Sequence, residues 1–570
     1  MKKLIAMILI LAMVMILPVA CGTEQTASVD SKEDGINSTY LVWNMGKEPK
    51  TFDPGINTGA AGGQIITNIF EGLYYETKTG GLEPAQAESY TVSEDGLTYT
   101  FTLRDGIKWS DGKPVTAGDF EYSWKRVCTA ETGANYSFIM APYLKNGMKC
   151  LAGECDLDDV GVKALNDTTL EVKLEAPCSY FLSLTTFFTY LPVRQDIIEN
   201  NDEGWDKDVT TCITNGPFVL EEYKIGDKVK IKRNPNYWNA ENVKLAGVEA
   251  LFISEATTAL NGYQSGEIQI NSQIPKDALA NLIATDPNVI MEADLGTYFL
   301  DFNCDVEPFN DVNVRKAFAL AIDRKMLVDQ VTKGGEIAAT GMIPPVLSWT
   351  DGTCCRKIDA NGNAEKEYGI DPNKAQVEEA KAYLAEAGYP DGKGFPTIVY
   401  KYSTGEAHQK IGEALQEMWK TNLGVNVTLQ NEDWQVFSGS RSRGDYQVAR
   451  GGWYGDYADP MTFLDLYTSY SGNNDPQWRY SLQKEVAPHD QVLNPENEAF
   501  DEIIKKAMLV HGEEKDNLYR QAEKMIIEDN CIISPLYYYT SIYLVDKTRV
   551  VGLDTTKIGQ WLFKGAMMIQ

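Results

Sequence analysis

The sequence has few of the features that mark common enzymes and nucleic-acid-binding proteins. Histidine occurs only three times in 570 residues, as His408, His489 and His511, so a multi-histidine metal centre would require three distant segments to converge. We find no phosphate-binding loop, no Gly-x-Gly-x-x-Gly, no Gly-x-Ser-x-Gly elbow and no His-Glu-x-x-His motif. The sequence therefore disfavours the common hydrolases and nucleotide-binding enzymes, and we expect neither a metal nor a cofactor.

Positive charge is also scarce. The chain has 52 Lys and Arg against 81 Asp and Glu, which gives a net charge of −29. Such a chain repels phosphate backbones, so binding to nucleic acid is not expected. What it has in quantity is aromatic side chains, with 30 Tyr, 19 Phe and 11 Trp in a composition that is 43% hydrophobic. This composition is typical of folded globular proteins, and the length suits several domains.

Long apolar runs are absent apart from one at the start of the chain. Lys2 and Lys3 precede an uninterrupted apolar run at residues 4–17, which is shorter than the roughly 20 residues of a membrane span. The pattern predicts a signal peptide over residues 1–20. The residues before Cys21 resemble a bacterial lipobox, although Pro18 departs from it, so we expect lipidation of Cys21. An ordinary signal peptide cut nearby is the alternative. The small polar residues 21–39 read as a flexible tether.

Cysteine use gives a weaker signal. The chain has ten cysteines, so nine remain besides Cys21 and at least one cannot pair within the chain. Cys150 and Cys155 could form a bridge across a short loop. Cys354 and Cys355 are adjacent and are expected in a surface loop without metal. Apolar surroundings predict buried free thiols at three other positions: Cys178, Cys304 and Cys531.

Residue patterns predict a mixed α/β fold. Alternating residues 98–103 and 169–174 predict strands, so the region 91–191 is partly β. Asp371 and Pro372 predict a helix start, and Gly388 followed by Pro390 predicts its end. A strand at 397–402, a helix and a strand at 425–429 then predict a parallel crossover unit. His408 falls where the first strand passes into the helix, as a ligand contact or as an ordinary surface residue.

The segment 441–460 carries the most distinctive chemistry. Paired glycines within it allow a backbone to approach a ligand closely, and aromatic residues flank Asp456. Those aromatic residues are Trp453, Tyr454 and Tyr457. A carboxylate between aromatic walls favours a cationic ligand. The alternative is that Asp456 only caps the turn before Asp459.

This segment, with its sequence VARGGWYGDYADP at residues 448–460, resembles the signature of extracytoplasmic oligopeptide-binding proteins, the family 5 solute-binding components of ABC importers. Further blocks agree with the family in its order along the chain: residues 70–73, 93–120, 215–218, 233–238 and 309–324. Together they span about residues 40–545, nearly the whole chain after the signal segment.

The resemblance implies an α/β fold of the type II periplasmic-binding-protein kind, a two-lobed clamp with an extra third α+β domain. By family analogy, lobe I combines residues 40–73, 192–295 and 525–570. The extra domain is expected at 74–191 and lobe II at 296–524. The ligand is expected between the lobes.

The resemblance also implies roles for particular residues. Asp456 is expected to pair with the α-ammonium of a peptide, and Gly452 and Tyr454 to offer backbone groups to it as an added strand. Arg441, Arg450 and His408 match the positions that meet the C-terminal carboxylate. Pocket walls are expected from Trp434, Trp453, Phe299 and one tyrosine of residues 537–539, for which we choose Tyr539.

Two departures from the family pattern change the charge of the expected pocket. Thr58 stands near the position of a family glutamate, and Thr332, with Lys333 adjacent, stands where a lysine is found. The preferred peptide length and composition therefore cannot be transferred from the family.

The expected function is a non-enzymatic, monomeric receptor that delivers oligopeptides to membrane permease subunits driven by a separate ATPase. Another ligand on the same fold, such as a dipeptide, a nickel chelate or a sugar, is the main alternative, because fold does not fix function. An exported peptidase is the alternative from a different class.

Overall fold

The computed structural model describes residues 40–77, 81–201, 204–359, 362–479 and 494–569. The predicted signal peptide, Cys21, the tether and His489 lie outside these ranges, and their assignments stay predictions. Within the described ranges, no helix has the length and the apolar character needed to cross a membrane.

A large mixed sheet forms the centre of the structure. Its strands follow the order β15-β14-β16-β12-β17-β11-β1-β10-β9-β8, and β13 pairs with β17 beside this path. The strands are β1 (Leu41–Asn44), β8 (Phe218–Lys224), β9 (Lys228–Arg233), β10 (Gly247–Leu251), β11 (Ile270–Asn271), β12 (Val289–Phe302), β13 (Ile337–Ala338), β14 (Ile398–Ser403), β15 (Val427–Glu432), β16 (Val448–Tyr454) and β17 (Ile533–Val545).

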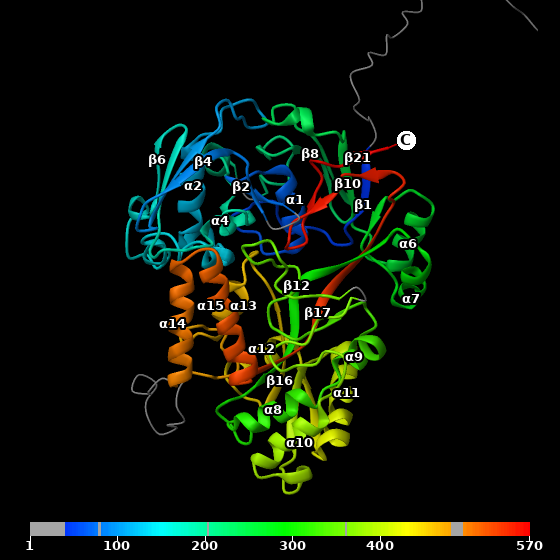
Figure 1. Ribbon diagram of the computed structural model, residues 1–570. Helices are drawn as coiled ribbons and strands as arrows, with labels where there is room; N and C mark the ends of the chain where they lie inside the picture. The colour runs from blue at the N-terminus through cyan, green and yellow to red at the C-terminus, as the bar shows by residue number, and fades with distance from the viewer. Residues whose placement is uncertain (1–39, 78–80, 202–203, 360–361, 480–493, 570) are drawn as a thin grey trace, which may run out of the picture. The chain divides into compact units, whose positions relative to one another are not determined.

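Strands β12 and β17 join the two groups of strands in this sheet, and they lie side by side in Figure 1. They are 14 and 13 residues long, which is longer than a typical strand. Their pairing register shifts between Ala293 and Thr297 and again between Tyr298 and Phe299. Such irregularities bend a strand locally, and here they lie where β12 begins to pair with β16 at Gly296.

A second, four-stranded antiparallel sheet lies inside the region predicted as the extra domain. Its order is β4-β5-β7-β6, with β4 (Ala87–Val92), β5 (Thr98–Leu103), β6 (Val162–Asn166) and β7 (Thr169–Lys173). Helix α2 (Ala117–Val127) begins with a capping box between Thr116 and Asp119 and buries Phe120 and Trp124. The two strands predicted in this region are confirmed, and so is the mixed α/β class. The bounds of the lobes and of the extra domain stay predictions.

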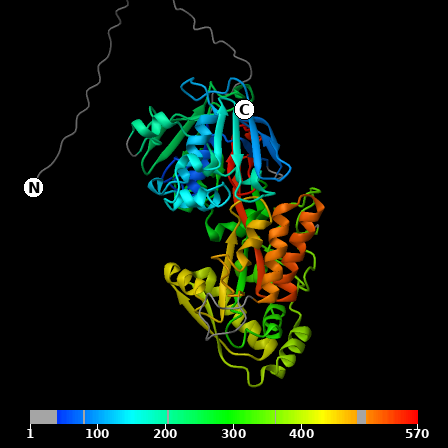
Figure 2. The same cartoon turned by 90° about the vertical axis from the view of Figure 1, so that its left-hand side faces the viewer.

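The remaining helices are α1 (Ala60–Ile69), α3 (Gly147–Leu151), α4 (Phe181–Leu184), α5 (Gln195–Asn200), α6 (Ala256–Gln264), α7 (Lys276–Thr285), α8 (Val312–Leu320), α9 (Arg324–Met326), α10 (Val377–Glu386), α11 (Glu406–Leu423), α12 (Trp434–Ser442), α13 (Met461–Leu464), α14 (Pro495–Leu509) and α15 (Glu513–Lys524). Helices α14 and α15 lie side by side in both views (Figures 1 and 2). Short strand pairs join β2 (Tyr74–Glu76) to β3 (Leu82–Pro84), β18 (Val550–Val551) to β21 (Met567–Met568), and β19 (Asp554–Thr555) to β20 (Trp561–Leu562).

The predicted strand, helix and strand unit is confirmed as β14, α11 and β15. The two strands pair in parallel from Ile398 with Val427 to Ser403 with Glu432. Helix α11 buries Ile411, Leu415 and Trp419 at helical spacing and ends before Gly424.

One predicted helix start is wrong. The helix expected from Asp371 begins only at Val377. The side chain of Asp371 accepts a hydrogen bond from the backbone N–H of Asn373, and the side-chain oxygen of Gln376 accepts one from the N–H of Asp371. These contacts form a turn that competes with the helix, which is a property that Asp shares with Asn and Ser.

All nine described cysteines are free thiols. Cys150 and Cys155 nevertheless lie close, with their sulfur atoms 2.7 Å apart. Cys178 and Cys531 are buried as expected, whereas Cys304 is only partly buried. Of the adjacent pair, Cys354 is exposed and Cys355 is buried, so only half of that pair belongs to the surface.

Candidate functional site

Strand β16 carries four of the ten predicted site residues and has one open edge. It pairs with β12 along its whole length, but with β14 only at Val448 and Ala449. The backbone N–H of Gly455 donates to the carbonyl of Leu295 at 2.8 Å. Because antiparallel strands alternate their hydrogen bonds, Gly451 and Trp453 direct their backbone groups to β12 as Gly455 does. The backbone groups of Gly452 and Tyr454 therefore point to the open edge, where an extended chain could pair with them.

The paired glycines of β16 are required by aromatic side chains of the protein itself. A Cβ atom on Gly451 would lie 2.3 Å from the ring of Phe299. A Cβ atom on Gly452 would lie 2.8 Å from the hydroxyl of Tyr539. The sequence pattern predicted a close approach of backbone to a ligand, and the structure shows close approach to two of the predicted wall residues.

The predicted side chains divide between the two faces of the sheet. Residues that are paired across strands share a face, and neighbours along a strand alternate. Arg450 and Tyr454 therefore lie on the face of Tyr298, which pairs with Gly452. Phe299 and Trp453 lie on the opposite face, because they pair with Gly451 and Thr297. Phe299 is only 5% exposed, so it supports β16 and offers little surface to a ligand.

Asp456 follows the end of β16 and has no charge partner. Within the described ranges, no hydrogen-bond donor or cation is paired with its carboxylate, and burial raises its pKa to about 6. The alternative role as a turn cap belongs to another residue, since Asp459 accepts the backbone N–H of Met461 at 3.0 Å. Asp459 is also paired with Lys515 at 2.9 Å. A partly buried carboxylate without a counter-ion is a ready partner for a cation.

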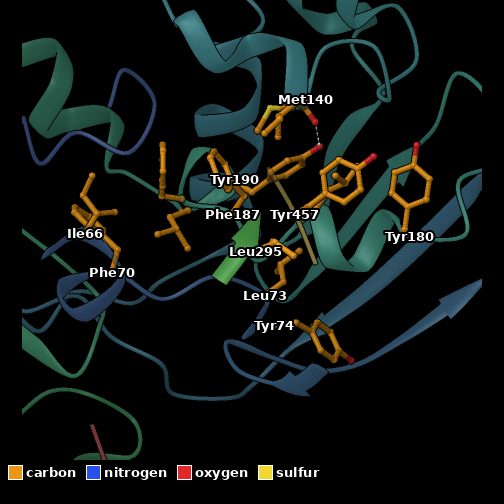
Figure 3. Close-up of a cluster of buried hydrophobic side chains, with 14 of the residues drawn as sticks. Ile66, Phe70, Leu73, Tyr74, Met140, Tyr180, Phe187, Tyr190, Leu295 and Tyr457 are labelled. Atoms are coloured by element: carbon orange, nitrogen blue, oxygen red, sulfur yellow. Dashed lines mark hydrogen bonds between the residues drawn. The ribbon is translucent and has the colours of Figure 1, made fainter. Parts of the chain in front are cut away.

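Aromatic residues of the predicted extra domain reach the neighbourhood of Asp456. Tyr457 stacks on Tyr180 with ring centroids 5.1 Å apart and an interplanar angle of 4°. Both belong to a buried cluster that includes Leu295, as Figure 3 shows. The hydroxyl of Tyr457 donates to Asp465 at 3.3 Å, and burial raises the pKa of Asp465 to about 7. Tightly packed aromatic side chains therefore surround the carboxylates at this end of the site.

Arg450 is surrounded by aromatic side chains and not by carboxylates. Its guanidinium lies over the ring of Tyr298 at 5.2 Å and near that of Trp434 at 5.9 Å. Among the described residues it forms no ion pair with a carboxylate, and its buried Nε has no acceptor. A desolvated guanidinium in this state is suited to a carboxylate of a ligand.

His408 is the third residue of α11 and lies beside Arg450, on the Tyr298 face. Its Nδ1 is 3.3 Å from the Tyr298 hydroxyl. Burial, with a further effect from the charge of Arg450, lowers the pKa of His408 to about 4. The imidazole is therefore neutral at neutral pH, so it can donate or accept a hydrogen bond but does not act as a cation.

Arg441 on α12 is already paired with carboxylates. Its Nε lies 2.7 Å from Asp475, and its Nη1 lies 3.9 Å from Asp301. The same Nη1 donates to the backbone carbonyl of Arg450 at 3.4 Å. Asp301 projects to the face opposite Arg450, because it pairs with Ala449 in the β12 register. The structure thus brings Arg450 and His408 together and directs Arg441 to different partners.

Trp434 and Tyr539 present aromatic surface near Arg450. Trp434 is the first residue of α12 and is 56% exposed. Tyr539 stacks on Tyr454 with centroids 4.6 Å apart and an interplanar angle of 9°. Tyr454 remains 54% exposed, so this stack offers an open aromatic surface beside the free edge of β16.

Sequence reasoning missed Tyr298, which contacts both His408 and Arg450. A signal was present, because Tyr298 precedes Phe299 on a strand and the two must face opposite ways. The two departures from the family pattern are both near the surface: Thr58 is exposed just before α1, and the Thr332 hydroxyl donates to Glu336 at 2.8 Å. No group of three potential metal ligands is found in the part of the chain that the structure describes.

Comparison with protein families gives one clear match. The family model for bacterial extracellular solute-binding proteins, family 5, matches residues 81–475. The chain is 33% identical to the oligopeptide-binding protein OppA of Bacillus subtilis over 573 residues, which covers 99% of each chain. It is also 33% identical to the periplasmic oligopeptide-binding protein OppA of Salmonella typhimurium, over 92% of each chain.

Solved structures agree with this match. The unliganded open form of the periplasmic murein tripeptide-binding protein MppA has a TM-score of 0.79 and 31% identity, and covers 93% of this chain and 97% of that one. The complex of Haemophilus influenzae OppA with the peptide RPPGFSPFR has a TM-score of 0.66 and 29% identity, with coverage of 93% and 99%.

Proposed function

The chain belongs to the bacterial extracellular solute-binding proteins of family 5, and from this premise we propose that it is an oligopeptide receptor. It captures peptides outside the cytoplasm and delivers them to permease subunits of an ABC importer, whose ATPase is a separate polypeptide. Proteins of this family bind solutes and are not enzymes, which agrees with the lack of catalytic motifs in the sequence.

One observation carries the proposal: an unpaired carboxylate stands at the end of an open strand edge. Asp456 supplies a charge for the α-ammonium, and Gly452 and Tyr454 direct backbone groups to an added strand. Arg450 supplies a charge for the C-terminal carboxylate. A peptide bound in this way runs antiparallel to β16, with its amino end toward Asp456. Recognition rests on groups that every peptide has, so a broad range of sequences is accepted.

The direct test is to identify what the protein carries. Ligands released by denaturing the purified chain are analysed by mass spectrometry, and calorimetry then measures binding of a peptide panel. The proposal expects peptides with free amino ends, saturable binding and complete recovery of uncleaved peptide. Cleavage that copurifies with the protein favours the peptidase alternative, and release of a sugar, a metal chelate or a steroid favours another ligand on the same fold.

Anchoring is the second part of the proposal. Cys21 would carry a diacylglycerol, and residues 21–39 would tether a monomeric receptor to the outer face of the membrane. Two acyl chains anchor stably where one does not, so a Cys21→Ala variant is expected in the medium. Unchanged membrane retention of that variant, with no lipid label on the wild type, contradicts the anchor.

A further inference from the structure

A cavity of about 600 Å³ lies between the first half of β12, the second half of β17, helix α1 and the C-terminal segment. Its walls include the side chains of Trp43, Gln64, Asp294, Ser541, Tyr543 and Trp561. The volume falls in the range of small-ligand pockets. None of the residues that the sequence predicted for peptide contact lines it.

The cavity lies on the β12 side of β16, the strand with which the peptide is proposed to pair. Asp294 lies two residues before Gly296, and Gly296 pairs with Tyr454 of β16. The charge of Asp294 also contributes to the raised pKa of Tyr454, which places the two groups within electrostatic range. An extended peptide sends alternate side chains to opposite sides. Peptide side chains that project toward α1 can therefore extend into this cavity.

Asp294 gives the cavity a specific chemistry. Its carboxylate accepts hydrogen bonds from the Ser541 hydroxyl and from the Leu295 N–H, both at 3.0 Å. In the described ranges no cation is paired with it, although burial raises its pKa. Two lysines also line the cavity, but neither is paired with Asp294: Lys557 donates to the carbonyl of Val346, and Lys47 is exposed.

The walls around Asp294 suit a long cationic side chain. Trp43 and Trp561 line the cavity as a packed apolar wall, since they are 2% and 6% exposed, and an apolar wall suits the methylene stem of lysine or arginine.

We propose that this cavity receives a lysine or arginine side chain of the bound peptide and that Asp294 is its counter-ion. The inference rests on the proposed function and adds to it a preference for basic peptides. The net charge of −29 acts in the same direction, because it attracts cationic ligands at long range.

The test uses the full chain and pairs of short peptides that differ only by lysine or norleucine at one position. Norleucine keeps the methylene stem and removes the charge. Calorimetry on the wild type is expected to show one position at which lysine binds at least tenfold more tightly. In Asp294→Asn that preference is expected to disappear, while affinity for the norleucine peptide stays within about threefold. Asp227→Asn, at an exposed turn between β8 and β9, is the matched control and should keep the preference.

Each outcome of this experiment is decisive. Equal binding of lysine and norleucine peptides at every position, in a wild type that binds both, overturns this inference and leaves the peptide receptor intact. A lysine preference that persists in Asp294→Asn also overturns it. Failure of every peptide to bind overturns the proposed function together with the inference. The wild-type comparison needs no variant, so a folding defect in Asp294→Asn does not block the test.

Discussion

The two ends of the candidate site differ in how many charges they offer and how each is used. At the Asp456 end, one carboxylate has no counter-ion among the described residues and is available to the proposed α-ammonium. At the other end the sequence offers three cations, but Arg441 is paired with Asp475 and Asp301, and His408 is neutral at neutral pH. Of the three, only Arg450 both stays charged at neutral pH and has no carboxylate partner in the described part of the chain. The proposed site therefore has one usable charge at each end. The three candidate cations at the carboxyl end do not add up to three charges.

The largest effect is expected from the amino end. Leaving a buried charge without its partner costs about 3 to 5 kcal/mol, which corresponds to a loss of affinity of roughly 100-fold or more. Asp456→Asn should therefore nearly abolish peptide binding in calorimetry. The free variant should melt no lower than the wild type, because the raised pKa of Asp456 shows that its charge is unfavourable in the folded state.

Acetylation of the peptide amino group is the matched chemical control. It removes the same charge pair from the ligand side, so it should weaken binding to the wild type strongly and add little further loss in Asp456→Asn. This non-additivity separates a direct contact from a general defect. Equal affinity of the wild type for free and acetylated peptides would refute the assignment.

How much of the fold and the site can be predicted from the sequence depends on how far apart in the chain the interacting residues are. Strands β5, β14 and β15 and helix α11 follow from local periodicity, and the expected α/β class is confirmed. The start of α10 does not follow, because the turn at Asp371 competes with the capping signal. The pairing of Arg441 with Asp301 and Asp475 joins residues far apart in the chain, so no local pattern reveals it. The same holds for the contact of His408 with Tyr298.

At the carboxyl end, Arg450 and Arg441 should behave in opposite ways. A hydrogen bond to a charged group contributes about 1.5 to 3 kcal/mol, so Arg450→Gln should weaken binding of a free-carboxylate peptide about 10- to 100-fold. It should change binding of the C-terminal amide much less. Arg441→Gln should leave affinity within about threefold and lower the melting temperature, because two buried carboxylates lose their cation. A loss of affinity in Arg441→Gln that disappears with the amide would show that both arginines meet the ligand.

The pH profile sharpens the comparison with a smaller effect. Asp456 must be ionised to hold the ammonium, and its pKa in the free protein is about 6. Affinity is therefore expected to be level near pH 7 and to fall by up to about tenfold per unit as the pH drops below 6. It should fall again above about pH 8, where the peptide amino group loses its proton.

Two controls isolate Asp456 in this profile. Asp465, with a pKa of about 7, titrates nearby and is expected to shift the acid limb only slightly. Asp456→Asn should remove the acid limb of whatever binding remains, measured with a peptide of high affinity. An acid limb that survives in this variant and disappears in Asp465→Asn would assign the titration to the second carboxylate.

The smallest effect is expected at His408, and it separates charge from contact. With a pKa of about 4 the imidazole carries no charge at pH 7, and its contact is with the Tyr298 hydroxyl. His408→Gln keeps a polar group there and should change affinity by less than about threefold, equally for free-carboxylate and amidated peptides. Calorimetry at pH 7 on both peptides checks this. A loss of affinity confined to the free-carboxylate peptide would mean that His408 becomes protonated on binding, because the ligand carboxylate would raise the pKa of the imidazole toward 7. In that case two cations, Arg450 and His408, would contact the ligand at the carboxyl end. The difference in charge number between the two ends would then exist only in the unliganded protein.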